Sequence, residues 1–305
     1  MTDSTTSGAP DTRLTPPAPL PAPDLTALAL RAAGGDRDAL EAVCRGVQDM
    51  VYRLALRFFG TPQDAEDATQ EVLVLVVTHL GGFEGRSRFT TWVYTIASRY
   101  LLRAKRKQVE SSVAGPEPFA NWLDTHLAPE AYQAESEAEY RMLCEEVRIS
   151  CTYGMLLTLS RDLRITYILG DLLEMTDKEG AEALGISPAA FRQRVTRARA
   201  TVRPIIAGRC SVVDPAGTCA CDRQIAPSIA CGLIPPTGPV FVALQRGAPV
   251  QATTVGGVEV DRLRRAADQL DVAERFAETF RTEPQFQAPA RVLDALREAC
   301  PDLLG

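Results

Sequence analysis

The sequence is poor in residues and segments on which several large classes of protein depend. Aromatic residues make up only 6% of its 305 residues, and its two histidines, His79 and His126, stand far apart. It has no apolar run near the roughly 20 residues that a membrane-spanning helix needs. Its N-terminus has neither the basic stretch nor the apolar stretch of a secretory signal. We therefore expect a cytoplasmic protein with no membrane association.

Motifs for catalysis are missing as well. The sequence contains no paired catalytic carboxylates, phosphate-binding glycine loop, nucleophile motif or HExxH motif. These arrangements supply the reactive groups or the metal in many enzymes. We therefore expect that the protein is not an enzyme.

The charge is low overall but unevenly distributed. A net charge of −6 by itself argues against a nucleic-acid-binding protein. However, residues 86–107 hold seven basic residues and no acid, and residues 192–209 hold six basic residues and no acid. Because salt screens charges beyond about 8–10 Å, a local basic surface matters more for binding than the total charge. Two basic segments on an acidic chain therefore keep nucleic-acid binding open.

Helical periodicity, capping residues and glycine breaks predict an all-α protein with two small helical domains. A flexible linker joins the two domains, and a C-terminal extension follows them. The predicted segments are a disordered Pro-rich tail (1–24), an N-terminal domain (25–107), an acidic linker with one short helix (108–140), a helix-turn-helix domain (141–207), a Cys-rich segment (208–240) and a mostly helical remainder (241–305).

A helix-turn-helix pattern occupies residues 177–195. Gly185 permits the left-handed turn, Ser187 caps the second helix, and Phe191 faces inward. The pattern directs Ala190 and several arginines toward a DNA major groove. An ordinary helical hairpin with a solvated basic face is the alternative, and the flanking arginines favour DNA. The outward-facing arginines are Arg192, Arg194 and Arg197.

An aromatic segment lies within the first basic stretch. We expect Trp92 mainly to pack in the core, and we expect exposure at Phe89, where a loop meets a helix. Opening DNA costs about 1.4 kcal/mol per base-pair step. Stacking of a base on an aromatic ring returns about 1–3 kcal/mol. A protein that captures one or two unpaired bases can thus hold a short bubble open without ATP.

The helix predicted over residues 61–80 begins with acidic residues and continues with an apolar stretch over residues 72–77. Such a helix is either a core helix with a solvated acidic start or half of an interface with another protein.

These features together resemble the bacterial RNA polymerase sigma factors of the extracytoplasmic-function (ECF) group. Their second conserved region is similar to residues 25–107, and their fourth to residues 141–205. The resemblance implies contact with core RNA polymerase through Asp64, Glu66, Asp67, Gln70 and Glu71. It also implies reading and melting of the −10 element by Arg86, Ser87, Arg88, Phe89, Thr91, Trp92, Tyr94, Arg99 and Arg103. The helix-turn-helix, with Ser187, Ala190 and its arginines, is similar to the reader of the −35 element.

Two departures from the family pattern stand in the helix-turn-helix domain. The segment 157–162 lacks the usual proline, and Gly180 replaces a branched apolar residue. Glycine in a helix costs up to about 1 kcal/mol relative to alanine. We expect both departures to weaken binding to the −35 element.

Four cysteines, Cys210, Cys219, Cys221 and Cys231, follow the helix-turn-helix domain. The resemblance extends to family members whose cysteine-rich C-terminal segments respond to metals. Zinc or copper binding, or redox sensing, is one interpretation, and a set of reduced buried thiols is the other. The spacing lacks the paired CxxC pattern of a typical zinc site. We expect packing roles for Cys44, Cys144, Cys151 and Cys300.

Residues 240–260 have a β-like pattern, and residues 261–279 and 288–299 have the pattern of amphipathic helices. By its position, the extension is a candidate built-in regulator that replaces or supplements a separate anti-sigma protein.

Two function classes follow. The first is a sigma factor that binds core RNA polymerase, recognises the −35 and −10 elements and promotes strand opening. The alternative is a one-component helix-turn-helix regulator with a metal- or redox-sensing C-terminal segment. The acidic helix discriminates between them, because only the first needs a surface for polymerase.

Overall fold

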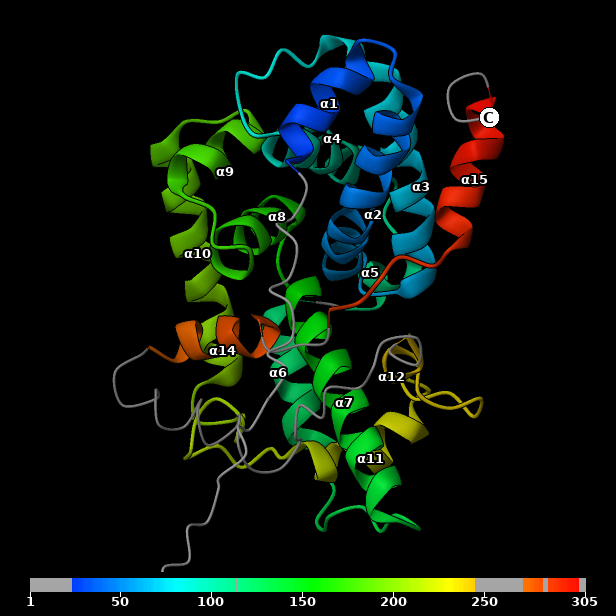
Figure 1. The fold of residues 1–305 in the computed structure, drawn as a ribbon. Coiled ribbons are helices and arrows are strands. Elements are labelled where there is room, and N and C mark those ends of the chain that lie inside the picture. The colour runs from blue at the N-terminus through cyan, green and yellow to red at the C-terminus, as the bar shows by residue number, and fades with distance from the viewer. Residues whose placement is uncertain (1–23, 114, 245–270, 282–284, 302–305) are drawn as a thin grey trace, which may run out of the picture.

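The computed structural model describes residues 24–113, 115–244, 271–281 and 285–301. This part of the chain is helical apart from one isolated β-bridge between Cys210 and Cys219, so the predicted all-α class is confirmed (Figure 1). Apart from Asp24, the predicted Pro-rich tail lies outside the described residues. Among the helices described, none combines the length and apolarity that crossing a bilayer requires.

Capping residues mark several helix ends in the N-terminal domain. Asp24 and Asp36 accept backbone hydrogen bonds at the starts of the first two helices. Gly60 ends the second helix at a φ of +78°, and Pro62 opens the third. The elements are α1 (Leu25–Ala33), α2 (Arg37–Phe59), α3 (Pro62–His79), a short 3₁₀ turn η1 (Leu80–Gly82) and α4 (Phe89–Arg103).

The helix-turn-helix domain is built from four helices and one π-helical turn. Its first long helix ends at Leu157 without the proline that the family pattern contains, and the next begins four residues later. A π-helical turn, η2, then leads into the helix-turn-helix itself. The elements are α7 (Glu137–Leu157), α8 (Arg161–Tyr167), η2 (Ile168–Leu172), α9 (Asp177–Leu184) and α10 (Pro188–Ile206).

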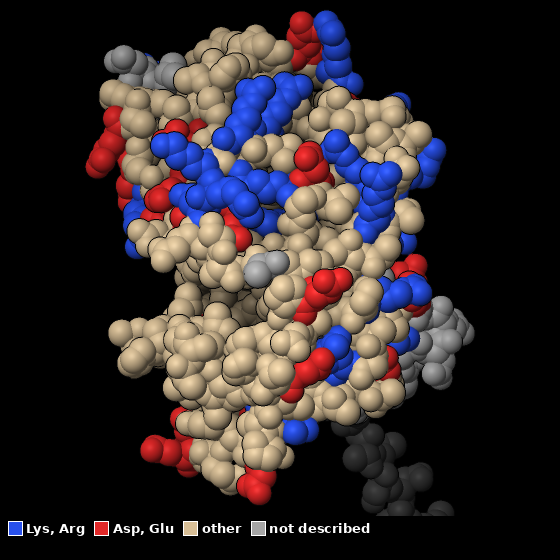
Figure 2. Space-filling model, turned by 180° about the vertical axis from the view of Figure 1, so that it is seen from behind, with Lys and Arg blue, Asp and Glu red and all other residues tan. Residues whose placement is uncertain are grey.

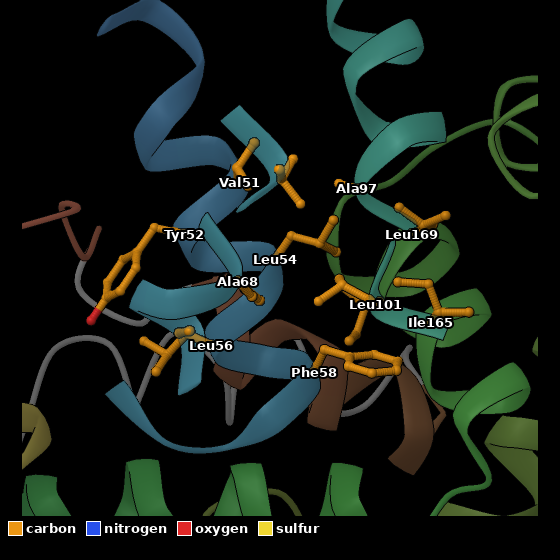
Figure 3. Close-up of a cluster of buried hydrophobic side chains, with 14 of the residues drawn as sticks. Val51, Tyr52, Leu54, Leu56, Phe58, Ala68, Ala97, Leu101, Ile165 and Leu169 are labelled. Carbon is orange, nitrogen blue, oxygen red and sulfur yellow. The ribbon is translucent and has the colours of Figure 1, made fainter. Parts of the chain in front are cut away.

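The two domains share one hydrophobic core. In Figure 3, Phe58 of α2 and Leu101 of α4 lie against Ile165 of α8 and Leu169 of η2. These side chains are buried almost completely. Helix α9 also packs on α4, so the helix-turn-helix lies directly beside the aromatic segment of the N-terminal domain (Figure 1).

The linker differs from the predicted flexible tether with one short helix. It holds two helices, and Glu110 in the first is buried. The Glu110 carboxylate accepts hydrogen bonds from Arg161 and Arg164, each at 2.8 Å. A buried carboxylate with two arginine partners fixes its segment in place. The linker helices are α5 (Gln108–Ser112) and α6 (Pro116–Thr125).

The C-terminal extension wraps back over both domains. Helix α14 packs on α10 and η2, whereas α15 packs on α3 and α2 (Figure 1). The described residues 241–244 of the predicted β-like stretch are helical, and the rest of that stretch lies outside the described residues. In the described part of the range 261–279 a helix runs from Val272, and in the range 288–299 a helix runs from Arg291. The elements are α11 (Cys221–Ala230), α12 (Phe241–Leu244), α14 (Val272–Arg281) and α15 (Arg291–Ala299).

Candidate polymerase- and DNA-binding surfaces

The acidic start of α3 is partly neutralised within the N-terminal domain. Asp64 accepts a hydrogen bond from Thr61 Oγ1 at 2.6 Å and lies 2.9 Å from the ammonium group of Lys107. The hydrogen bond with Asp64 raises the pKa of Lys107. The first carboxylate of the predicted polymerase-binding set is therefore held by its own domain.

The second carboxylate of that set is held by the C-terminal extension. Glu66 is buried and forms a two-point ion pair with Arg291 of α15. Further along α3, Asp67 and Glu71 are exposed and Gln70 is half-buried. Of the five predicted residues, only these last three remain open to a partner protein.

The aromatic segment forms a packed cluster rather than an exposed loop. The rings of Phe83 and Phe89 meet edge to face at 5.1 Å, and Phe89 stacks on Trp92 at 5.6 Å. Phe89 has no exposed surface, so the prediction that it is the exposed ring was wrong. Trp92, expected mainly in the core, is half-buried and presents the more accessible ring. The reason is that Phe89 begins α4 and faces inward from its first turn.

The other predicted residues of this surface divide into packed and exposed groups. Thr91 is buried, and Tyr94 is half-buried with its pKa raised to about 12 by desolvation. Ser87 is half-buried. The arginines stand outside, and those at positions 86, 88, 99 and 103 are all exposed. In Figure 2, Lys and Arg side chains gather over the upper half of the back face, the half that holds α1, α4 and α9 in Figure 1.

The helix-turn-helix has the predicted local geometry. Thr176 and Glu179 form a reciprocal capping box at the start of α9. Gly185 takes the left-handed conformation at φ +66°, and Ser187 Oγ accepts a hydrogen bond from the backbone N–H of Ala190 at 3.2 Å. Phe191 is buried, as predicted.

The recognition helix α10 presents its arginines outward. Arg192 pairs with Asp177 at 3.0 Å, and Arg194 pairs with Asp162 at 3.3 Å. Arg197 is exposed. Exposed ion pairs of this kind contribute about 0–1 kcal/mol, so phosphate groups can replace the acidic partners at small cost.

The structure explains why position 180 is a glycine, which the sequence did not. A Cβ atom at this position would collide with the ring of Phe191. Gly170 in η2 faces the same ring. Glycine at position 180 therefore lets α9 lie close against the buried aromatic residue of α10.

Comparisons with known proteins identify two sigma-factor regions in this chain. The family profile of Sigma-70 region 2 matches residues 44–110, and that of Sigma-70 region 4 matches residues 150–202. The chain belongs to the ECF RNA polymerase sigma factors. It is therefore a factor that initiates transcription through RNA polymerase, and it is not an enzyme.

Relatives cover the two sigma domains but not the whole chain. ECF sigma factor SigW of Bacillus subtilis is 24% identical over 174 residues, which span 55% of this chain and 89% of SigW. The sigma-E factor of Escherichia coli is 28% identical over 176 residues, which span 56% of this chain and 88% of that protein. SigG of Mycobacterium tuberculosis is 30% identical over 174 residues, and the match spans 47% of SigG. A solved structure of CnrH in complex with the cytosolic domain of CnrY covers 60% of this chain with a TM-score of 0.42 and 21% identity.

The structure describes all four cysteines of the Cys-rich segment. Cys210 and Cys219 adjoin across the β-bridge, where Ser211 N–H donates to the Cys219 carbonyl at 3.0 Å. Burial and the neighbouring Cys210 and Cys151 raise the pKa of the Cys221 thiol. Cys231 stands apart and exposed at the end of α11.

The pKa of the Cys151 thiol of α7 is also raised, by burial and by the neighbouring Cys210 and Cys219. In the part of the chain that the structure describes, no three or more His, Cys, Asp or Glu side chains are arranged to hold a metal ion. Metal binding at the Cys-rich segment stays a prediction.

Proposed function

We propose that this sigma factor docks on core RNA polymerase through α3, with Asp67 and Glu71 as its accessible contacts. The observation that carries this proposal is an exposed acidic row on a helix whose other face fills the core of the N-terminal domain. Asp64, Glu66 and Gln70 complete the surface when their present neighbours move. Charge complementarity of this kind sets the rate and specificity of docking more than its strength.

For the −10 element, the segment from Arg86 to Arg103 supplies the DNA-binding groups. The half-buried Trp92 offers a ring for an unpaired base, supported from behind by Phe83 and Phe89. The same segment carries four exposed arginines, at positions 86, 88, 99 and 103, which suit the phosphates of an opened strand. One or two stacked bases return about 1–3 kcal/mol each, which offsets the opening of a short bubble.

The −35 element is proposed to bind α10. Ser187 and Ala190 lie at its N-terminus, and Arg192, Arg194 and Arg197 follow at the surface. In helix-turn-helix proteins the N-terminal residues of the second helix contact base edges. Arginine pairs with guanine or with phosphate, so these three side chains serve sequence reading and positioning alike.

Run-off transcription with purified core polymerase tests this assignment. Asp67→Lys should reduce transcription at least about tenfold, because it reverses an exposed charge on the docking helix. Glu130→Lys reverses an exposed charge in the linker and should leave transcription unchanged. Equal transcription by the two variants would contradict the assignment of Asp67 to the polymerase-docking surface.

We also propose that Cys210, Cys219 and Cys221, with Cys151, take up zinc or copper. The support is their proximity across α7 and the Cys-rich segment, and binding requires the thiols to draw together. Cys219→Ser should lower the metal content of the purified protein, whereas the matched Cys231→Ser should not. A chelator should then increase protease cleavage within residues 208–240. Unchanged metal content in Cys219→Ser contradicts the proposal.

The protein is proposed to act in the cytoplasm, where the polymerase that it serves is found. A separate anti-sigma protein is proposed as an additional partner of the two sigma domains. Co-purification of the chain with another protein bound to α3 or α10 would support it.

A further inference from the structure

The two proposed DNA-reading surfaces lie too close together to bind the two elements of one promoter at the same time. The −35 and −10 elements are about 25 base pairs apart, which is roughly 85 Å along B-form DNA. In this structure α9 packs on α4, and one core runs through both domains. A sigma factor that reads both elements must therefore move its two domains apart.

The C-terminal extension holds this closed arrangement from both sides. On the helix-turn-helix domain, Arg203 of α10 pairs with Asp271, and Arg281 donates to the carbonyl oxygen of Asp171 at 2.6 Å. On the N-terminal domain, the buried Arg57 donates to the carbonyl oxygen of Phe280 at 3.1 Å. The α14 segment thus contacts both domains across their junction.

Helix α15 continues this contact onto the docking helix. Its apolar face, with Val292, Leu296 and then Cys300 at four-residue spacing, is buried on α2 and α3. Its polar face reaches two carboxylates, since Arg291 pairs with Glu66 and Arg297 pairs with Glu41 at 2.6 Å. A nine-residue helix has little stability alone in water, so α15 keeps its form only while it is docked.

We propose that residues 271–281 and 285–301 act as an autoinhibitory strap, in which α15 occupies the polymerase-docking face at Glu66 while α14 keeps the two domains together. The proposal rests on the proposed role of α3. Polymerase and α15 compete for the same side of α3, so binding of polymerase requires release of the strap. Release also frees the helix-turn-helix domain to move away toward the −35 element.

The test uses the full chain and measures its affinity for bacterial core RNA polymerase. Leu296→Asp places a charge in the α15 contact and should tighten binding at least about tenfold if the closed state holds nine-tenths or more of the molecules. Arg291→Glu removes the ion pair with Glu66 and should tighten binding to a smaller extent. Glu298→Arg changes the exposed face of the same helix and should bind like the parent.

Alkylation of cysteines, followed by mass spectrometry, reports the position of α15 independently. Cys300 is buried and should react slowly in the parent, then quickly in Leu296→Asp and after addition of polymerase. The exposed Cys231 should react quickly throughout and serves as the internal control. Fast reaction of Cys300 in Leu296→Asp with unchanged affinity for polymerase overturns the strap, and so does a Cys300 that stays protected in that variant. If neither parent nor variant binds polymerase, the assignment of α3 itself fails.

Discussion

The proposed binding residues differ in how much they contribute to the packing of the N-terminal domain and of the helix-turn-helix domain. In the N-terminal domain, Phe89 and Thr91 belong to the core, and Glu66 is covered by the C-terminal extension. In the helix-turn-helix domain, Arg192 and Arg197 stand at the surface and contribute little to packing. The first surface is therefore tied to the stability of its domain, whereas the second is nearly independent of it.

The partners of the charged residues show the same difference. Glu66 is neutralised by Arg291, 225 residues away in the chain, whereas Arg192 pairs with Asp177 of its own motif. A distant partner makes the exposure of Glu66 depend on the conformation of the extension. A local partner is simply displaced by DNA. The proposed strap would therefore act on polymerase docking before it acts on DNA binding.

The largest expected effect comes from the buried ion pair at the junction of the domains. Arg164 is 2% exposed and donates to Glu110 and to the carbonyl oxygen of Phe58. Arg164→Met leaves the buried Glu110 with Arg161 alone and should lower the free energy of unfolding by about 3–5 kcal/mol. Urea denaturation measures this. Arg141→Met, at an exposed pair in α7, should cost less than about 1 kcal/mol. Equal losses would contradict a shared core.

Two substitutions in the aromatic segment separate its contribution to stability from its proposed contribution to binding of an unpaired strand. Phe89→Ala empties a fully buried site and should lower the free energy of unfolding by about 3–5 kcal/mol. Trp92→Ala removes a half-buried ring, so its stability loss should be smaller. Its binding to a single-stranded −10 oligonucleotide should weaken by about 1–3 kcal/mol, measured by fluorescence anisotropy. If Trp92→Ala binds the strand as well as the parent does, Trp92 is not the base-stacking ring.

Much of the fold was predictable because its signals are local. Asp36, Gly60, Pro62 and Gly185 mark helix ends through capping and backbone preference, and the structure has helix ends at each of them. The burial of Phe89 was not predictable in this way. A loop-to-helix junction indicates nothing about which side of the first turn meets the core.

The joining of the domains was not predictable either. Glu110 lies in an acidic, proline-containing stretch that has the composition of a tether. Its partners Arg161 and Arg164 are more than 50 residues away, and nothing in their local patterns indicates pairing. The pairing of Arg291 with Glu66 is a non-local contact of the same kind. Local periodicity predicts helices, but it does not predict which distant charges meet.

Acid should loosen the junction of the domains through Glu110. Burial raises the pKa of Glu110, but hydrogen bonds from Arg161, Lys107 N–H and Arg164 outweigh it and lower the pKa from 4.5 to about 2. A lowered pKa in the folded state stabilises the fold above the unfolded value near 4.5, and this contribution is lost as the pH falls toward 2. The loss should reach about 3 kcal/mol.

Denaturation in urea between pH 5 and pH 2 measures this contribution. Glu110→Gln has no charge to titrate, so its stability should be lower at pH 5 and should depend less on pH over this range. A variant whose pH dependence matches that of the parent would show that Glu110 does not control acid sensitivity.

A substitution at the close contact between α9 and α10 should have a smaller effect on the free energy of unfolding. Gly180→Ala places a methyl group against the ring of Phe191 and should lower the free energy of unfolding by about 1–3 kcal/mol. Gly81→Ala meets no atom within 4 Å and serves as the matched control. Thermal denaturation compares the two variants. A more stable Gly180→Ala would mean that helix propensity outweighs the contact with Phe191, and the family's branched residue would then be compatible with this site.

The smallest effect is expected at Arg197, where a substitution should change DNA binding but leave the free energy of unfolding unchanged. Each phosphate contact adds about 0.9 to the slope of log affinity against log salt concentration on B-form DNA. If Arg197 contacts a phosphate, Arg197→Ala should lower that slope by about 0.9 for a duplex with the −35 element. Its unfolding in urea should match that of the parent, because the side chain is exposed. An unchanged slope with weaker binding to the preferred sequence would place Arg197 at a base edge instead. Loss of stability would contradict the contrast between the two domains, since it would show that the recognition helix also depends on its DNA-facing residues for its fold.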